Sequence, residues 1–128
     1  MNILLDTHLL LWIACEPERV PEVVLERLLD DRVTAFFSAA NIWEIAIKSS
    51  QGRPDFDLDS GLFRRNLLGH GYQEIEVTGA HAAHVQTLPA IHRDPFDRIL
   101  IAQAQLESIP LYTRDSQIAQ YPGPIIRV

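Results

Sequence analysis

The sequence lacks most of the features that mark secreted, membrane-spanning or zinc-binding proteins. It has a single cysteine, Cys15, which excludes an internal disulfide framework and a zinc site of the Cys₄ or Cys₂His₂ kind. The apolar run at residues 9–15 is far shorter than the roughly 20 residues that span a bilayer. The N-terminus shows neither the charged segment nor the cleavage site of a signal peptide. We therefore expect a cytoplasmic protein.

Basic residues and glycine-rich loops are also scarce. The chain has 11 Lys and Arg against 17 Asp and Glu, which gives a formal charge of −6 and argues against a broad basic surface for nucleic acid. The lack of a glycine-rich nucleotide loop weakens the interpretation as an NTPase. No repeat, low-complexity tract or linker interrupts the chain, so we expect one domain over residues 1–128.

Apolar, β-rich segments alternate with segments of helical periodicity. The expected strands are residues 3–5, 33–37, 73–77, 110–113 and 125–126, and the expected helices are residues 9–14, 21–29, 39–50, 62–68, 80–88 and 95–107. This alternation predicts an α/β domain in which helices flank a central, mainly parallel sheet. The ligand sites of such sheets lie beyond the carboxyl ends of the strands.

Four acidic residues fall where this topology can bring them to one edge of the sheet: Asp6, Glu44, Asp97 and Asp115. Asp115 could instead cap a short helix, and Asp97 could favour a helix dipole. Glu44 falls away from the apolar stripe of its helix, so we expect it to point into a solvated cleft, where it could pair with Lys48 one turn later as an exposed partner. Asp6 is hardest to dismiss, because a carboxylate that ends a buried strand needs a partner.

Carboxylates that converge repel one another unless they are protonated or share a cation. Mg²⁺ and Mn²⁺ are the simplest cations for such a site, since both prefer oxygen ligands. Mg²⁺ commonly keeps several waters, which leaves positions for a phosphate oxygen and an attacking water. The acidic pattern therefore suggests phosphodiester hydrolysis.

Four segments resemble the ordered blocks of the PIN-domain family: LLDTHLLLW at 4–12, SAANIWEIAIK at 38–48, HRDPFDRILIAQA at 92–104 and LYTRD at 111–115. Together with the chain length, they resemble the VapC-like toxins of bacterial type II toxin–antitoxin pairs, over essentially the whole chain. The resemblance implies a three-layer PIN-like fold and a metal-dependent ribonuclease that uses Mg²⁺ or Mn²⁺. It matches the four family acids, which bind metal and orient the attacking water, to Asp6, Glu44, Asp97 and Asp115. It also implies a homodimer and a cognate VapB-like antitoxin whose carboxyl-terminal segment enters the acid site.

Several residues near the four acids have two alternative roles. Thr7 matches the family's hydroxyl position after the first acid, so it could bind a metal-bound water or phosphate, or it could cap the following helix. Arg98 and Arg114, like His92 and Arg93, could hold substrate phosphates, or the arginines could form internal ion pairs. Asp94 is expected to cap the helix that contains the assigned acid three residues later.

Several other features have an ordinary structural interpretation. Trp12 and Trp43 lie in apolar helical stripes and are expected to pack in the core. The segment 62–68 could cover the core or form an apolar groove for a partner helix, and the resemblance favours the groove.

An aspartate-based phosphotransfer domain, either a phosphatase or a receiver, is the main alternative function. A haloacid dehalogenase-like phosphatase needs a second Asp two residues after the first, where this chain has His8. A receiver domain wants an acidic pair beside the first strand and a lysine after the last major strand. This chain has a single Asp at the first place and Arg114 near the second.

Overall fold

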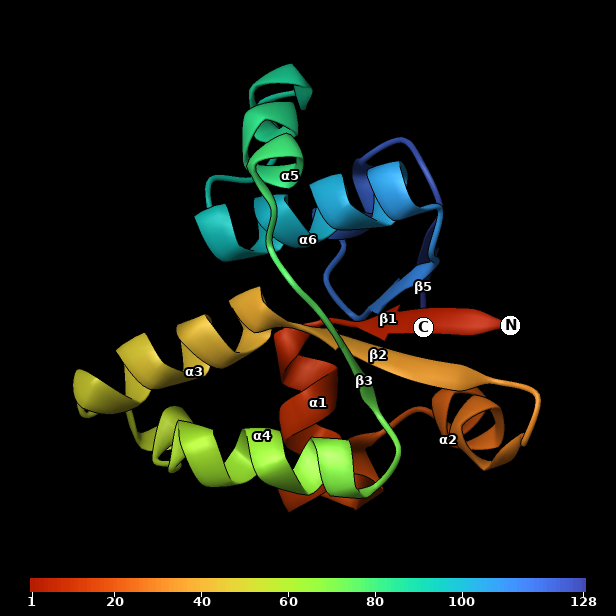
Figure 1. Ribbon diagram of the computed structural model, residues 1–128, viewed down its shortest axis with the longest axis vertical. Coiled ribbons are helices and arrows are strands. Elements are labelled where there is room, and N and C mark those ends of the chain that lie inside the picture. Colours follow the sequence, from red (N-terminus) through yellow and green to blue (C-terminus); the bar gives the residue numbers. More distant parts are fainter.

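In the computed structural model, helices surround one parallel sheet (Figure 1). Residues 1–54 and 56–128 are described in full and residue 55 by its backbone. The strands are β1 (Asn2–Leu5), β2 (Thr34–Ser38), β3 (Gln73–Ile75), β4 (Leu111–Thr113) and β5 (Ile125–Arg127). The α-helices are α1 (Thr7–Cys15), α2 (Glu22–Leu29), α3 (Ala39–Ser50), α4 (Ser60–Gly69), α5 (Gly79–His84) and α6 (Pro95–Glu107).

The sheet is parallel throughout, with the strand order β3-β2-β1-β4-β5. From β1 the chain builds outward through β2 and β3 and then returns to place β4 and β5 on the other side of β1. The order therefore reverses between β1 and β4, and a crevice forms beyond the carboxyl ends of strands at such a point. The two chain segments that leave these strands begin with Asp6 and Arg114.

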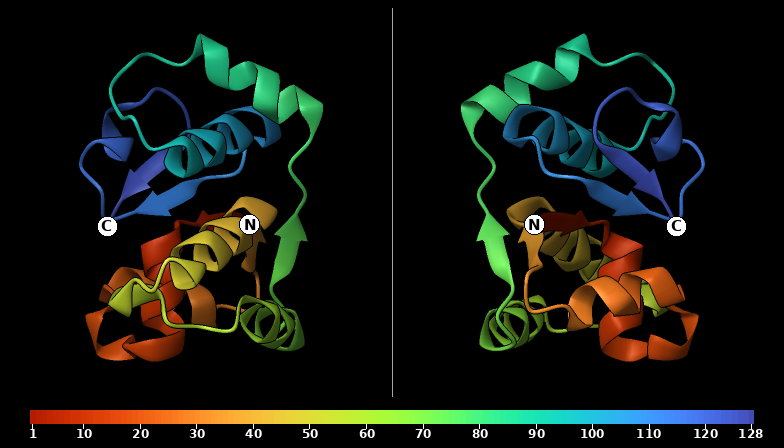
Figure 2. Two further views of the ribbon diagram at one scale, coloured as in Figure 1. Left: turned by 90° about the vertical axis from the view of Figure 1, so that its left-hand side faces the viewer. Right: turned by 90° about the vertical axis from the view of Figure 1, so that its right-hand side faces the viewer.

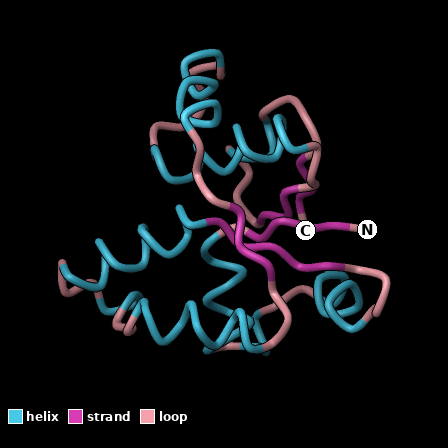
Figure 3. The backbone as a smooth tube through the Cα atoms, in the orientation of Figure 1, coloured by secondary structure: helices cyan, strands magenta, loops and turns pink.

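The alternation of side chains along β1 divides the core into two parts. Ile3 and Leu5 pack with α1, α2, α3 and α4, whereas Leu4 packs with α6 and the segment after it. Helix α5 packs outside α6. Both side views show the strands between two groups of helices (Figure 2), and the trace coloured by secondary structure shows the same order (Figure 3). The prediction of an α/β fold with three layers is confirmed.

Polar side chains set the beginnings of the helices that carry the candidate acids. Ser38 forms a capping box with Asn41 at the start of α3. Asp94 caps α6, where its carboxylate accepts a hydrogen bond from the Phe96 amide at 2.8 Å, so the expected cap is confirmed. The expectation that Thr7 caps α1 is wrong. The cap is Asp6, because its Oδ1 accepts from the Leu9 amide at 2.9 Å while Thr7 is already helical.

One expected core residue lies at the surface. Trp43 is 61% exposed and contacts the edge of Phe96, whereas Trp12 is partly buried against the core. The helical stripe predicted an apolar face, but the flanking elements cover only part of it. None of the helices that the structure describes is both long and apolar enough to cross a bilayer.

Candidate functional site

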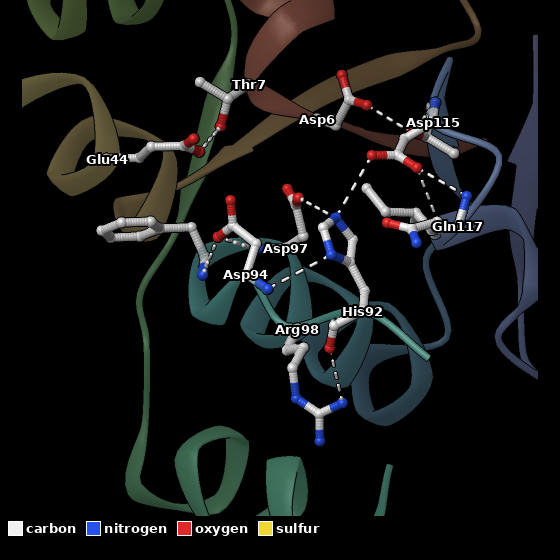
Figure 4. A network of polar contacts seen from close by, with 12 residues as sticks. Asp6, Thr7, Glu44, His92, Asp94, Asp97, Arg98, Asp115 and Gln117 are labelled. Carbon is white, nitrogen blue, oxygen red and sulfur yellow. Dashed lines mark hydrogen bonds and ion pairs between the residues drawn. The ribbon is translucent and has the colours of Figure 1, made fainter. Parts of the chain in front are cut away.

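The structure brings the four predicted acids to the crevice at the carboxyl edge of the sheet. Asp6 follows β1, Asp115 follows β4, Asp97 lies in the first turn of α6 and Glu44 lies in α3. Figure 4 shows their carboxylates around one space, together with the cap residue Asp94. Residues far apart in the sequence meet here because parallel strands end on the same side of the sheet.

The electrostatics of Asp97 show how close the acids lie. Burial, and after it the negative charges of Asp94, Glu44, Asp6 and Asp115, together raise the pKa of the Asp97 carboxyl from the ordinary 3.8 to about 8. A carboxyl with this pKa holds its proton at neutral pH unless a cation replaces it. The site therefore favours a positive charge near Asp97.

Asp6 is held in one orientation by two donors. Its Oδ1 accepts from the Leu9 amide, and its Oδ2 accepts from the Thr113 hydroxyl at 2.6 Å. Burial raises the pKa of the Asp6 carboxyl, and these two hydrogen bonds oppose the rise. The Thr113 hydroxyl also accepts from the Asp115 amide at 2.9 Å. Thr113 thus connects two of the predicted acids, a role that nothing in the sequence marked beyond its place in the segment LYTRD.

Glu44 is buried, with 2% exposure, so the expectation that it faces solvent is wrong. Its helix packs against α1, α4 and α6, so neighbouring elements surround it on more than its apolar side. One carboxylate oxygen accepts from the Thr7 hydroxyl at 2.5 Å and the other pairs with Lys48. The Thr7 hydroxyl in turn accepts from the side-chain Nδ2 of Asn41 at 3.0 Å. The expected pairing of Glu44 with Lys48 exists, but inside the protein.

His92 lies at the centre of the more open part of the site. Its Nε2 is 2.9 Å from Oδ2 of Asp97 and 3.4 Å from Oδ2 of Asp115. One ligand atom from each of these three residues lies within 4.8 Å of the other two, a spacing that could hold a metal ion. Asp6 and Glu44 lie outside this group of three. The sequence placed His92 beside the helix entry but did not single it out from its neighbours.

The Nε2 atom of His92 is buried, and no acceptor among the described residues is aligned with it as a hydrogen bond. Carboxylate oxygens with unused lone pairs are the ligands that Mg²⁺ and Mn²⁺ prefer. The donor set therefore fits a divalent cation beside Asp97 and Asp115.

The two arginines considered as phosphate ligands have other partners. The Arg98 guanidinium donates to the backbone carbonyls of Pro89 at 2.9 Å and Val85 at 3.1 Å, and it points away from Asp97 in Figure 4. Arg114 is exposed and donates to the carbonyl of Val128 at 3.1 Å. Arg98 therefore stabilises the segment before α6.

Comparisons with known proteins identify the family and the fold. The sequence matches the family profile described as PIN domain over residues 3–124. Its fold is similar to a chain of the VapBC2 complex from Rickettsia felis bound to a promoter DNA fragment, with a TM-score of 0.73, 14% identity and coverage of 99% of this chain and 98% of that one. A search of curated proteins returned no match.

Two further solved structures have the same fold. A toxin-antitoxin complex from Klebsiella pneumoniae gives a TM-score of 0.64 at 20% identity, with 97% of this chain and 95% of that chain covered. VapBC-1 from nontypeable Haemophilus influenzae gives 0.62 at 18% identity, with 94% and 91% covered. At these identities the likeness extends to the fold alone.

Proposed function

The chain belongs to the PIN domain family, whose members are nucleases, and from this premise we propose that it is a metal-dependent ribonuclease toxin. It would hydrolyse RNA phosphodiester bonds with Mg²⁺, or with Mn²⁺, and a cognate VapB-like antitoxin would neutralise it. The crowding of carboxylates around Asp97, with its pKa raised to about 8, carries this proposal. The similar folds in VapBC complexes support the toxin role. Its place of action would be the cytoplasm.

Asp97 and Asp115 would hold the cation, and Asp6 and Glu44 would line the same crevice beside it. When bound, a divalent cation supplies positive charge to the phosphoryl oxygens and acidifies water. The chain's own part is orientation, because Asp6 is fixed by Thr113 and Glu44 by Thr7. Fixed acids can orient an attacking water without reorganising as charge develops. No side-chain nucleophile is needed.

Thr7 would act through Glu44 in this scheme, since its hydroxyl already donates to that carboxylate. Arg114 is exposed near the acids and stays a candidate for phosphate binding, while Arg98 contributes by holding its loop. Phosphotransfer through Asp6 is disfavoured, because Asp6 is only 4% exposed and both of its oxygens already accept hydrogen bonds. An attacking carboxylate needs a free, accessible oxygen.

The hollow between α1 and α4 is a candidate surface for the antitoxin. It has a volume of about 260 Å³ and is lined by Ile13, Ala14, Phe63, Asn66, Leu67, His70 and Tyr72. Within the segment 62–68, Phe63 and Leu67 cover the core while Leu62 and Leu68 stay exposed. The segment therefore covers the core, and an apolar helix of an antitoxin could pack against its exposed side.

An apolar face around Trp43 is a candidate surface for a second copy of the chain. A hollow of about 500 Å³ there is lined by Ala39, Ala40, Trp43, Val77, Ala82, Val85, Pro95 and Ile99. Apolar patches of this kind commonly mark protein contacts. If the homodimer uses this face, Trp43→Glu should give a monomer in light scattering with little change in melting temperature. A dimer that persists in this variant would place the contact elsewhere.

The decisive experiment incubates the purified protein with bulk RNA and with structured tRNA, in Mg²⁺, in Mn²⁺ or in EDTA. We expect cleavage with either metal, none in EDTA, and none in the Asp6→Asn and Asp97→Asn variants. Glu107→Gln is a matched control, since that acid pairs with His81 at the C-terminal end of α6, whereas Asp97 lies in its first turn. Cleavage in EDTA, or undiminished cleavage by both aspartate variants, would overturn the mechanism.

A further inference from the structure

His92 has one ring nitrogen whose protonation is set by its neighbours. Its Nδ1 accepts a hydrogen bond from the Asp94 amide at 3.4 Å. A nitrogen that accepts carries no proton, so this contact fits the tautomer with the ring proton on Nε2. A nitrogen that ligates a metal must offer a lone pair and normally gives its other ring N–H to an acceptor. His92 has the opposite arrangement, with Nε2 as the donor.

This donor points into the crevice without an aligned acceptor among the described residues. Nε2 is buried and lies between Asp97 and Asp115 at 2.9 and 3.4 Å, yet neither carboxylate lies along its N–H direction. Buried donors are nearly always paired in native proteins, so an orphaned one beside a candidate site calls for an acceptor from a ligand. Figure 4 shows the ring edge facing the space between the two acids.

The backbone of His92 is clamped, which fixes the position of the ring. Its amide donates to the Tyr121 hydroxyl at 2.7 Å, and its carbonyl accepts from that hydroxyl and from Arg98. Arg98 also binds the Tyr121 hydroxyl at 3.1 Å and the carbonyl of Pro89. Such a set of supporting contacts keeps a donor where a reacting group needs it, at little cost in reorganisation.

We propose that His92 is a catalytic residue whose Nε2–H donates a hydrogen bond to a phosphoryl oxygen of the scissile phosphodiester. This inference rests on the proposed ribonuclease function and assigns the substrate contact in the same site. A phosphoryl oxygen seated beside Asp97 and Asp115 gives the orphaned N–H its acceptor, and the bond strengthens as negative charge grows on that oxygen. His92 makes this contact as a hydrogen-bond donor and does not ligate the cation.

Two substitutions at His92 separate the donor from the local fold. His92→Asn keeps an acceptor near the position of Nδ1 for the Asp94 amide but cannot reach the position of Nε2. His92→Gln can place an amide N–H near Nε2. His84→Asn is the matched control, because His84 contacts Gln105 outside the crevice. In single-turnover RNA cleavage at saturating Mg²⁺, we expect a loss of about 100-fold for His92→Asn, a smaller loss for His92→Gln and none for the control.

Two further measurements use the protein without RNA. Long-range ¹H–¹⁵N correlation should show the proton of His92 on Nε2, and a proton on Nδ1 overturns the proposal. Titration calorimetry with Mn²⁺ should give affinities within about threefold of wild type for both variants. A parallel loss of about tenfold or more would instead make His92 a ligand or a support of the cation site.

Failure of the proposed function is distinguishable from failure of this inference. If His92→Asn cleaves RNA as fast as wild type, the inference is wrong while the ribonuclease function stands. If wild type cleaves no RNA, the proposed function fails, and RNA affinity in Mg²⁺ then decides the role of His92. Fluorescence anisotropy should show weaker binding of labelled RNA by His92→Asn, and equal binding overturns the contact.

Discussion

The two halves of the acidic group differ in how completely their carboxylates are paired. Asp6 and Glu44, the buried pair, are 4% and 2% exposed, and each of their oxygens has a fixed partner within the protein. Asp97 and Asp115, the open pair, have side chains that are 16% and 38% exposed. The Nε2 atom of His92 lies between these two carboxylates, and its N–H is aligned with neither as a hydrogen bond.

Because of this difference, hydrogen bonds within the protein stabilise the buried pair, whereas the open pair has room for a ligand. The buried pair is stabilised by donors and by Lys48, so it belongs to the architecture as much as to the chemistry. The open pair accumulates negative charge, which raises the pKa of Asp97 to about 8. A cation should therefore act mainly on the open pair. Substitutions in the two halves should then change stability in opposite directions.

Loss of the Lys48 ammonium group, which pairs with the buried Glu44, should give the largest effect on stability. Lys48→Met removes the partner of Glu44 and leaves a buried charge uncompensated, which should lower the free energy of unfolding by about 3 kcal/mol or more. Urea denaturation followed by circular dichroism measures it. The double variant Lys48→Met/Glu44→Gln should recover most of the loss. A loss below about 1 kcal/mol in the single variant would mean that the buried half is less dependent on its partners than the geometry indicates.

The open half should respond in the opposite direction. Asp97→Asn should reduce RNA cleavage at least about 100-fold, equivalent to about 2.7 kcal/mol. It should also raise the melting temperature in EDTA by several degrees, because it removes a carboxyl that is unfavourable to ionise where it lies. Differential scanning calorimetry measures this shift. A lower melting temperature than wild type in EDTA would contradict the comparison.

Loss of the Thr113 hydroxyl, which donates to Asp6, should have an intermediate effect on stability. Thr113→Val keeps the side-chain shape but leaves one oxygen of Asp6 without its donor, which should destabilise the protein by about 1–2 kcal/mol. Thr113→Ser retains the hydroxyl and should recover most of that loss. Urea denaturation compares the two variants. If valine and serine destabilise equally, packing of the methyl group rather than the hydrogen bond supports Asp6.

The open half should also add a pH dependence to the stability, and Asp97→Asn should remove it. The pKa of Asp97 is about 8 in the folded chain against an ordinary 3.8, so unfolding releases a proton between these values. Stability from this group is therefore greatest at low pH and falls as pH rises toward 8, by at most about 1.4 kcal/mol per pH unit. Urea denaturation in EDTA at pH 5.5, 6.5 and 7.5 should show this slope in wild type relative to Asp97→Asn. Parallel curves for the two proteins would place the perturbed carboxyl elsewhere.

Much of the fold follows from local pattern, because period-2 and period-3.6 spacing report directly on burial in strands and helices. The parallel sheet, its flanking helices and the cap at Asp94 could be predicted in this way. The expectations for Trp43 and Glu44 were wrong for a common reason. Both lie on α3, and a single helix does not reveal which of its sides its neighbours will cover.

The candidate site was predictable in composition but not in contacts. That Asp6, Glu44, Asp97 and Asp115 converge follows from strand ends and helix starts in a parallel sheet, and their catalytic and metal-binding roles stay predictions. Thr113 escaped prediction, and His92 was considered only as one of several residues that could hold phosphate, because the contacts of both bridge groups from distant segments. The partners of Arg98 were also hidden, since backbone carbonyls leave no trace in a residue pattern.

By itself, the sequence determined the alternation of strands and helices, the places of the four acids and the blocks that match the PIN domain. Only the tertiary structure decided which acids are paired and which are open, because pairing depends on donors that arrive from other elements. The cap at Asp6, the buried pairing of Glu44 and the orphaned N–H of His92 all arise in this way. Burial in a shared crevice then decides their charges, since the cost of ionising a carboxyl is set by its surroundings and not by its position in the chain.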